Sequence, residues 1–133
     1  KNENRLEWDV SKIPHHCSYT ALSPEKGKEK TEPVPEVRWL FEDKGLEGGI
    51  LVSTSKPIPT NDDDNQPPHR QAANYYKDVA NMHDGEFTVT MEHPRIGAPR
   101  PIVIHIGTSK ATLEKRSLIG GAVATTRRAP RAG

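Results

Sequence analysis

Apolar and polar residues alternate most regularly at Glu86–Glu92, where Phe87, Val89 and Met91 are separated by threonines. A period of two is that of a β-strand with one buried face and one solvated or functional face. A second strand is predicted over 101–106, because three isoleucines recur there at every second position. The turn-like residues between the two strands predict an antiparallel hairpin.

The strongest helical pattern lies at Pro68–Met82, where Ala72, Tyr76, Val79 and Met82 recur at spacings of three and four. That spacing places them on one face of an α-helix. Consecutive prolines at the start suit a first helical turn, where a missing N–H costs nothing. The Asp-Gly pair after Met82 predicts the end of the helix.

The remaining segments predict short elements joined by loops. A brief strand is expected around Leu6–Val10 and must end at Pro14. The β-rich runs 36–41 and 49–54 are expected to pair as a second hairpin. The proline-rich stretches 23–35 and 56–68 are predicted to be irregular. A short helix is expected to start at Thr108 or Ser109 and to stop at the Gly-Gly pair 120–121.

The composition limits the size of the core. Leu, Ile, Val and Phe number only 25 of the 133 residues, and 12 prolines and 10 glycines interrupt them. We therefore expect an α+β fold with a small antiparallel sheet, one or two helices and long irregular arms. The expected divisions are an N-terminal arm and charged linker (1–35), a small core (36–121) and a basic C-terminal tail (122–133).

Cys17 is the only cysteine, so the chain cannot form an internal disulfide. This favours an intracellular, reducing compartment, of which the mitochondrial matrix is one. The sequence contains neither a run of about 18 apolar residues nor an apolar stretch near its start, so neither a membrane span nor a signal peptide is expected. Three metal-ligand types adjoin at His15–Cys17, but no second pair completes a metal site, and we expect neither a metal nor a cofactor.

Charge is divided unevenly along the chain. Residues 94–133 carry eight basic side chains and one acid, Glu114, and because the chain is +1 overall, residues 1–93 have a net charge of −6. A basic region rich in Gly and Pro favours contact with a polyanion such as folded RNA. We therefore expect a non-catalytic, RNA-binding structural subunit of a large ribonucleoprotein, such as a ribosome of organellar type, contacting RNA and neighbouring protein subunits. The expected RNA-binding residues are Arg95, Arg100, Lys110, Lys115, Arg116, Arg127, Arg128 and Arg131.

An enzymatic alternative rests on Glu86, Arg95, Arg100 and His105, all on the first predicted hairpin. A carboxylate base, phosphate-binding cations and an imidazole acid are the groups that metal-independent RNA cleavage requires. The stretch GEFTVTMEHPRIGAPRPIVIHIG resembles the central strands of the small microbial ribonucleases, without their upstream Asn-Arg-Glu segment and C-terminal histidine. The resemblance implies a small toxin-type endoribonuclease with these four residues as its catalytic groups.

A weaker pattern joins Arg38, the Ser53–Ser55 triplet and the downstream acids Glu86 and Glu92. Their order is similar to that of the Arg, Ser-Thr-Ser, Glu class of ADP-ribosyltransferases. The short spacing between the arginine and the serines, and the short chain, favour ordinary turn chemistry for the triplet instead.

Overall fold

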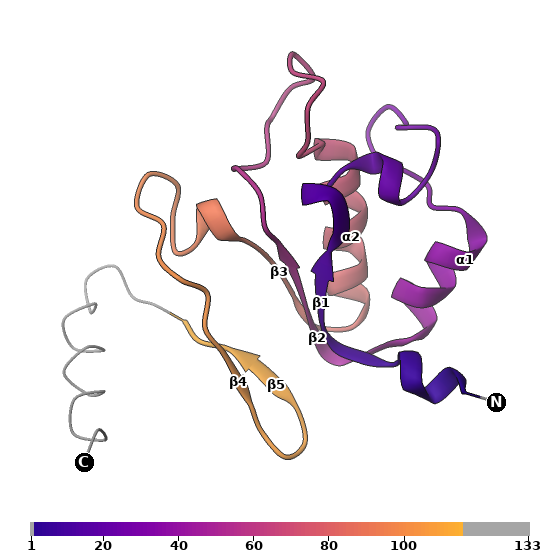
Figure 1. Cartoon of the computed structure of the whole chain (residues 1–133), viewed down its shortest axis with the longest axis vertical. Coiled ribbons are helices and arrows are strands. Elements are labelled where there is room, and N and C mark those ends of the chain that lie inside the picture. The colour runs from indigo at the N-terminus through magenta and orange to yellow at the C-terminus, as the bar shows by residue number, and fades with distance from the viewer. Residues whose placement is uncertain (1, 116–133) are drawn as a thin grey trace.

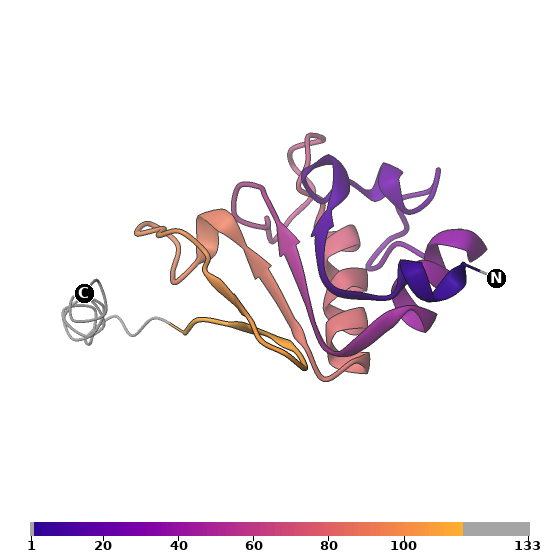
Figure 2. The same ribbon diagram turned by 60° about the horizontal axis from the view of Figure 1, so that its bottom comes forward.

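The centre of the computed structural model, which describes residues 2–115, is a three-stranded parallel sheet (Figure 1). Helix α2 packs against strands β2 and β3 of this sheet, and a separate two-stranded antiparallel hairpin lies at the opposite end of the molecule from helix α1 (Figures 1 and 2). The strands are β1 (Trp8–Ile13), β2 (Gly45–Ser53), β3 (Glu86–Val89), β4 (Ile104–Ile106) and β5 (Ala111–Leu113), and the α-helices are α1 (Pro35–Arg38) and α2 (Arg70–Met82).

Short 3₁₀ and π turns complete the described chain. They are η1 (Glu3–Leu6), η2 (Pro14–His16), η3 (Tyr19–Ala21), η4 (Trp39–Asp43) and η5 (Thr90–Glu92). The chain thus combines helices and strands, as predicted, but the predicted antiparallel sheet of an α+β fold is wrong for the larger sheet. Strand order is β1-β2-β3 with both pairings parallel, and only β4 and β5 pair antiparallel.

The expected hairpin of 36–41 with 49–54 does not form, because 36–41 is helical. Pro35 occupies the first turn of α1, and Val34 before it is extended. Val37, Leu40 and Phe41 recur at spacings of three and four, which is a helical pattern that a six-residue run cannot distinguish from a strand. The run at 49–54 is a strand, β2, but its partners are β1 and β3.

The expected hairpin of 86–92 with 101–106 does not form either. Strand β3 ends at Val89, pairs with β2 and gives way to the turn η5. Strand β4 instead pairs with β5, which occupies part of the range predicted as a helix from Thr108 or Ser109. The rest of that range, including Gly120 and Gly121, and the tail 122–133 lie outside the described residues.

The predicted helix forms as α2, but it starts at Arg70, so Pro67 and Pro68 precede its first turn and do not belong to it. Met82, expected on the same face as Ala72, Tyr76 and Val79, is 55% exposed whereas those three are buried. Strand β1 ends directly before Pro14 as expected.

The close approach of the chain to β2, between the end of α2 and the start of β3, depends on Gly85. A Cβ atom at that position would lie 1.9 Å from the backbone oxygen of Gly49, which is a severe steric clash. Gly85 therefore lets the chain turn from the helix into β3 against β2.

The core lies between the sheet, α2 and η4. Its fully buried residues include Ile13 of β1, Leu51 of β2 and Tyr76 of α2, and Phe41 packs edge-on against Tyr76 with the ring centroids 5.2 Å apart. The segment 1–35, expected as an arm, contributes β1 and the buried side chains Ile13, Cys17 and Leu22 to this core. These buried side chains enlarge a core for which the rest of the sequence provides few apolar residues.

The proline-rich segments have little regular structure, as predicted, but backbone hydrogen bonds hold them to the core. The amide of Thr31 donates to the carbonyl of Gln71 at 3.2 Å, and the amide of Val34 donates to that of Leu22 at 2.9 Å. In the second segment, the amide of Ile58 donates to a carboxylate oxygen of Glu92 at 2.6 Å. Irregular backbone can therefore be well anchored when its polar groups find partners.

Candidate nucleic-acid interface

Three exposed cations lie on two separate turns at the hairpin end of the molecule, the loop 93–101 beyond the carboxyl end of β3 and the β4–β5 turn beside Glu47 and Asp84 (Figure 1). Arg95 and Arg100 belong to the loop after η5, and Lys110 belongs to the turn between β4 and β5. The amide of Arg100 donates to the carbonyl of His93 at 2.7 Å, and the amide of Gly107 donates to the carbonyl of Lys110 at 2.9 Å. These bonds fix the backbone of each turn and leave the cationic side chains in solvent.

Arg95, Arg100 and Lys110 form no ion pair with any residue in the range 2–115. By contrast, Arg38 lies between two carboxylates, Glu32 at 3.0 Å and Glu42 at 3.3 Å. A guanidinium already held by carboxylates must lose those contacts before it can bind a phosphate. The cations of the hairpin end keep their donors available to an external anion.

Arg70 is held in the same way as Arg38. Its guanidinium lies 2.9 Å from Asp62 and 3.2 Å from Glu29, and Gln71 adds amide donors to Asp62. The bonds from Arg70, and then those from Gln71, hold the pKa of Asp62 below its ordinary value of 3.8. The acidic loop around Asp62 therefore serves to tie 56–68 to the start of α2.

The other predicted RNA-binding residues differ in placement. Lys115 is exposed but forms an ion pair with Glu86, so its charge is locally balanced. Arg116, Arg127, Arg128 and Arg131 lie outside the described residues. Ile96, which the sequence prediction omitted, stands 64% exposed beside Arg95. The sequence signal for Ile96 is an aliphatic residue placed between an arginine and a glycine within the turn 93–100.

The four residues of the predicted ribonuclease site do not contact one another. No hydrogen bond or ion pair within 2–115 joins any two of Glu86, Arg95, Arg100 and His105. Glu86 pairs with Lys115, and Nε2 of His105 lies 2.9 Å from Oε1 of Glu114. Glu86 begins β3, whereas the two arginines follow the end of that strand, so the sheet itself separates the carboxylate from the phosphate-binding groups.

The carboxyl ends of the three parallel strands form a second polar region, which the sequence analysis did not anticipate because it predicted antiparallel pairing. In parallel sheets this edge often binds ligands. Here the amide of Ser55 donates to Oγ1 of Thr90 at 3.2 Å, and the Thr90 hydroxyl donates back to the carbonyl oxygen of Ser55 at 3.2 Å. The hydroxyls of Ser53 and Ser55 lie 2.7 Å apart. The Ser-Thr-Ser triplet is thus used to join loops, and Arg38 lies on α1, in ion pairs.

The loop after β1 contains three consecutive residues with positive φ: His15 at 51°, His16 at 54° and Cys17 at 68°. The two histidines are exposed, and Nδ1 of His16 lies 2.7 Å from the carbonyl oxygen of Thr54. Cys17 is fully buried, and burial raises the pKa of its thiol to about 12. A neutral buried thiol is neither a nucleophile nor a metal ligand at physiological pH.

No protein-family model, curated protein or solved structure matches this chain. Within residues 2–115, no three His, Cys, Asp or Glu side chains gather closely enough to hold a metal ion. The same part of the chain contains no helix with the length and apolar character needed to cross a bilayer. Function is therefore inferred from the surface of the molecule itself.

Proposed function

We propose that this chain is a non-catalytic, RNA-binding structural subunit of a large ribonucleoprotein assembly in an intracellular, reducing compartment. The observation that carries the proposal is the pair of exposed arginines Arg95 and Arg100, which form no ion pair in the described part of the chain, whereas Lys110 shares a pocket with Glu47 and Asp84. Cations on turns neutralise phosphates without reading bases, so binding should depend on charge and shape more than on sequence.

The arrangement of charge supports the same proposal. The loop 93–101 and the β4–β5 hairpin lie at one end of the molecule, away from α1 and the N-terminal segment (Figures 1 and 2). The sequence of residues 116–133 contains four arginines and no acid. The net charge of −6 over 1–93 directs a polyanion away from the body and toward the basic end.

The test is fluorescence anisotropy with a labelled single-stranded RNA of mixed sequence at low salt. Replacing Arg95 and Arg100 together by alanine should weaken binding by about thirtyfold, since each lost phosphate contact is worth roughly 1 kcal/mol. The control replaces Lys30 and Arg38 by alanine, which removes the same charge from positions already held by carboxylates.

The control variant should lose less than about threefold in affinity, because only long-range attraction changes. An equal loss in both double variants would show that net charge alone drives the binding and would contradict the assigned interface. If the wild-type chain fails to bind RNA at low salt, the proposed function is wrong.

A further inference from the structure

The loop 93–101 is closed by its own backbone. The amide of Arg100 donates to the carbonyl of His93 at 2.7 Å. Inside that closure, the amide of Ala98 donates to the carbonyl of Arg95 at 3.3 Å, and Gly97 has the positive φ, 90°, that the third residue of a type II turn requires. Prolines at 94, 99 and 101 fix further backbone angles. The loop is therefore shaped before any ligand binds.

The tip of this loop is an exposed aliphatic side chain. Ile96 is the second residue of the turn 95–98 and is 64% exposed. A Cβ atom at the neighbouring Gly97 would meet no atom of the described chain within 4 Å, so the turn faces open space. The loop, drawn in orange, stands out from the body at the hairpin end in both views (Figures 1 and 2). A fixed protrusion of this kind fits a partner with a groove.

Arg95 and Arg100 indicate the chemistry of that partner. They flank the tip, both are exposed, and neither forms an ion pair within 2–115. Cations on both sides of an apolar tip match a groove with phosphates along its two edges. The minor groove of a nucleic-acid duplex accepts apolar side chains in this way, while arginines hold the adjacent phosphates. In A-form RNA that groove is wide and shallow, so a short loop can reach its floor.

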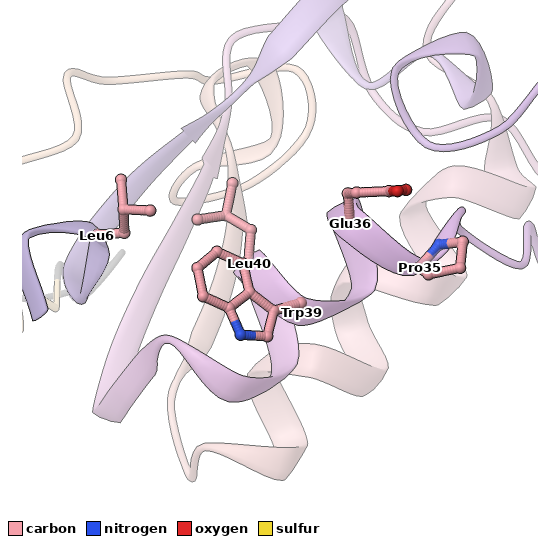
Figure 3. A pocket seen from close by; sticks show the side chains of 5 residues that line it. All are labelled: Leu6, Pro35, Glu36, Trp39 and Leu40. Atoms are coloured by element: carbon pink, nitrogen blue, oxygen red, sulfur yellow. The ribbon is translucent and has the colours of Figure 1, made fainter. Parts of the chain in front are cut away.

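The aromatic side chains lie elsewhere in the molecule. Proteins hold unpaired bases by stacking them on aromatic rings or on guanidinium planes. Phe87 is the last aromatic residue of the chain, and all the aromatic residues except Trp39 are in the core or packed against it. Trp39 lines an apolar groove with Leu6 and Leu40 at the opposite end of the molecule from the loop (Figure 3). The aromatic rings are thus not placed to stack bases beside Arg95 and Arg100.

We propose that the loop 93–101 binds the minor groove of double-helical RNA, with Ile96 in the groove and Arg95 and Arg100 on the phosphates beside it. The inference rests on the proposed RNA-binding function and specifies the RNA conformation that is bound. Single-stranded RNA keeps the contacts between arginines and phosphates but offers no groove to Ile96. A DNA duplex keeps the phosphates of two paired strands, but its minor groove is narrow and deep and lacks the 2′-hydroxyls.

The probes are a short RNA duplex, one of its strands alone and a DNA duplex of the same sequence, compared by fluorescence anisotropy at one low salt concentration. The chain variants are Ile96→Ser, which removes the apolar tip, and Ile96→Leu, which keeps it. The control is Leu6→Ser, which makes a similar change at a 47% exposed side chain at the other end of the molecule. Because both positions are exposed, each variant should keep the wild-type circular dichroism spectrum.

The RNA duplex should bind at least about tenfold more tightly than the single strand or the DNA duplex. Ile96→Ser should weaken duplex RNA binding by about tenfold, since burial of a large aliphatic side chain contributes roughly that factor. Its affinity for the single strand should stay within about twofold of wild type, and Ile96→Leu and Leu6→Ser should bind the RNA duplex as wild type does.

Equal affinity for the RNA duplex and the single strand, or for the RNA and DNA duplexes, would overturn this inference and leave RNA binding itself standing. Duplex RNA affinity that Ile96→Ser leaves unchanged would do the same. Binding to phosphatidylserine vesicles that depends on Ile96, with RNA affinity unaffected by Ile96→Ser, would assign the loop to a membrane surface and would also overturn it. If none of the three nucleic acids binds at low salt, the proposed function fails as well.

Discussion

Two adjacent tyrosines of α2 should respond oppositely to loss of their hydroxyl groups. Tyr75 is 3% exposed and donates from its hydroxyl to Oε2 of Glu42 at 2.9 Å. Tyr76 is fully buried, and its hydroxyl has no hydrogen-bond partner among the described residues. Burial raises the pKa of both phenols, so neither side chain ionises near neutral pH.

The expected magnitudes follow from those contacts. A hydrogen bond to a charged acceptor contributes about 1.5–3 kcal/mol, and because Glu42 is 19% exposed and shared with Arg38, we expect Tyr75→Phe to cost about 1.5 kcal/mol. An unpaired buried hydroxyl costs about 1–3 kcal/mol relative to an apolar group, so Tyr76→Phe should stabilise the fold by about 1 kcal/mol. Both changes remove one oxygen atom and keep the ring packing, which makes each the control for the other.

The assay is urea unfolding of the two variants and the wild type, followed by circular dichroism at neutral pH. Tyr75→Phe should lower the midpoint and Tyr76→Phe should raise it, with the same denaturant slope in all three proteins. If Tyr76→Phe destabilises the protein as much as Tyr75→Phe does, then the Tyr76 hydroxyl has a partner in solution and the description of this part of the core is wrong.

Four further predictions test other parts of the structure. Because burial raises the pKa of Cys17 to about 12, a disulfide reagent near pH 8 should modify the native chain far more slowly than the urea-unfolded chain, and equal rates would contradict its burial. Gly85→Ala should destabilise the fold by about 3 kcal/mol or more, measured by urea unfolding, because its Cβ meets strand backbone at 1.9 Å; a near-neutral effect would refute the close approach of β3 and β2. Bonds from Arg70 lower the folded-state pKa of Asp62 below 3.8, so ionised Asp62 stabilises the fold above pH 3.8, and this stabilisation is lost as the pH falls through the lower folded-state pKa. Asp62→Asn should therefore flatten the dependence of unfolding free energy on pH in that range, and an unchanged profile would contradict the Arg70–Asp62 ion pair. In excess chelator, neither wild type nor Glu86→Gln should cleave RNA, whereas cleavage by wild type alone would favour the ribonuclease alternative.

Local patterns predicted the elements that depend on near neighbours. The spacing of Ala72, Tyr76 and Val79 is enough to specify α2, and Pro14 is enough to end β1. The partner of β2 was not predictable in the same way. A run such as 49–54 pairs with whichever strand the rest of the chain brings beside it. Because 36–41 is helical, the segment nearest in the sequence could not serve as its partner strand. Parallel pairing across a crossover is non-local, so short-range signals favoured hairpins wrongly.

The candidate interface was likewise only partly predictable from local sequence patterns. Exposure of Arg95 and Arg100 follows from the Gly and Pro around them, which the sequence displays. That Lys115 is balanced by Glu86 while Arg95 is not depends on contacts between distant segments. The groove around Leu6 and Trp39 was also not predictable from local sequence, because residues 7–34 separate the segments that form its two walls.

The most direct test of the proposed RNA-binding role is the salt dependence of RNA affinity for the full chain beside a variant that lacks residues 122–133. For single-stranded RNA, each neutralised phosphate contributes about 0.7 to the slope of log affinity against log salt concentration. Removal of the three arginines in that segment should therefore reduce the slope by about 2, while Arg95 and Arg100 keep some salt-dependent binding. The same slope in both chains, or binding that does not depend on salt, would contradict the account.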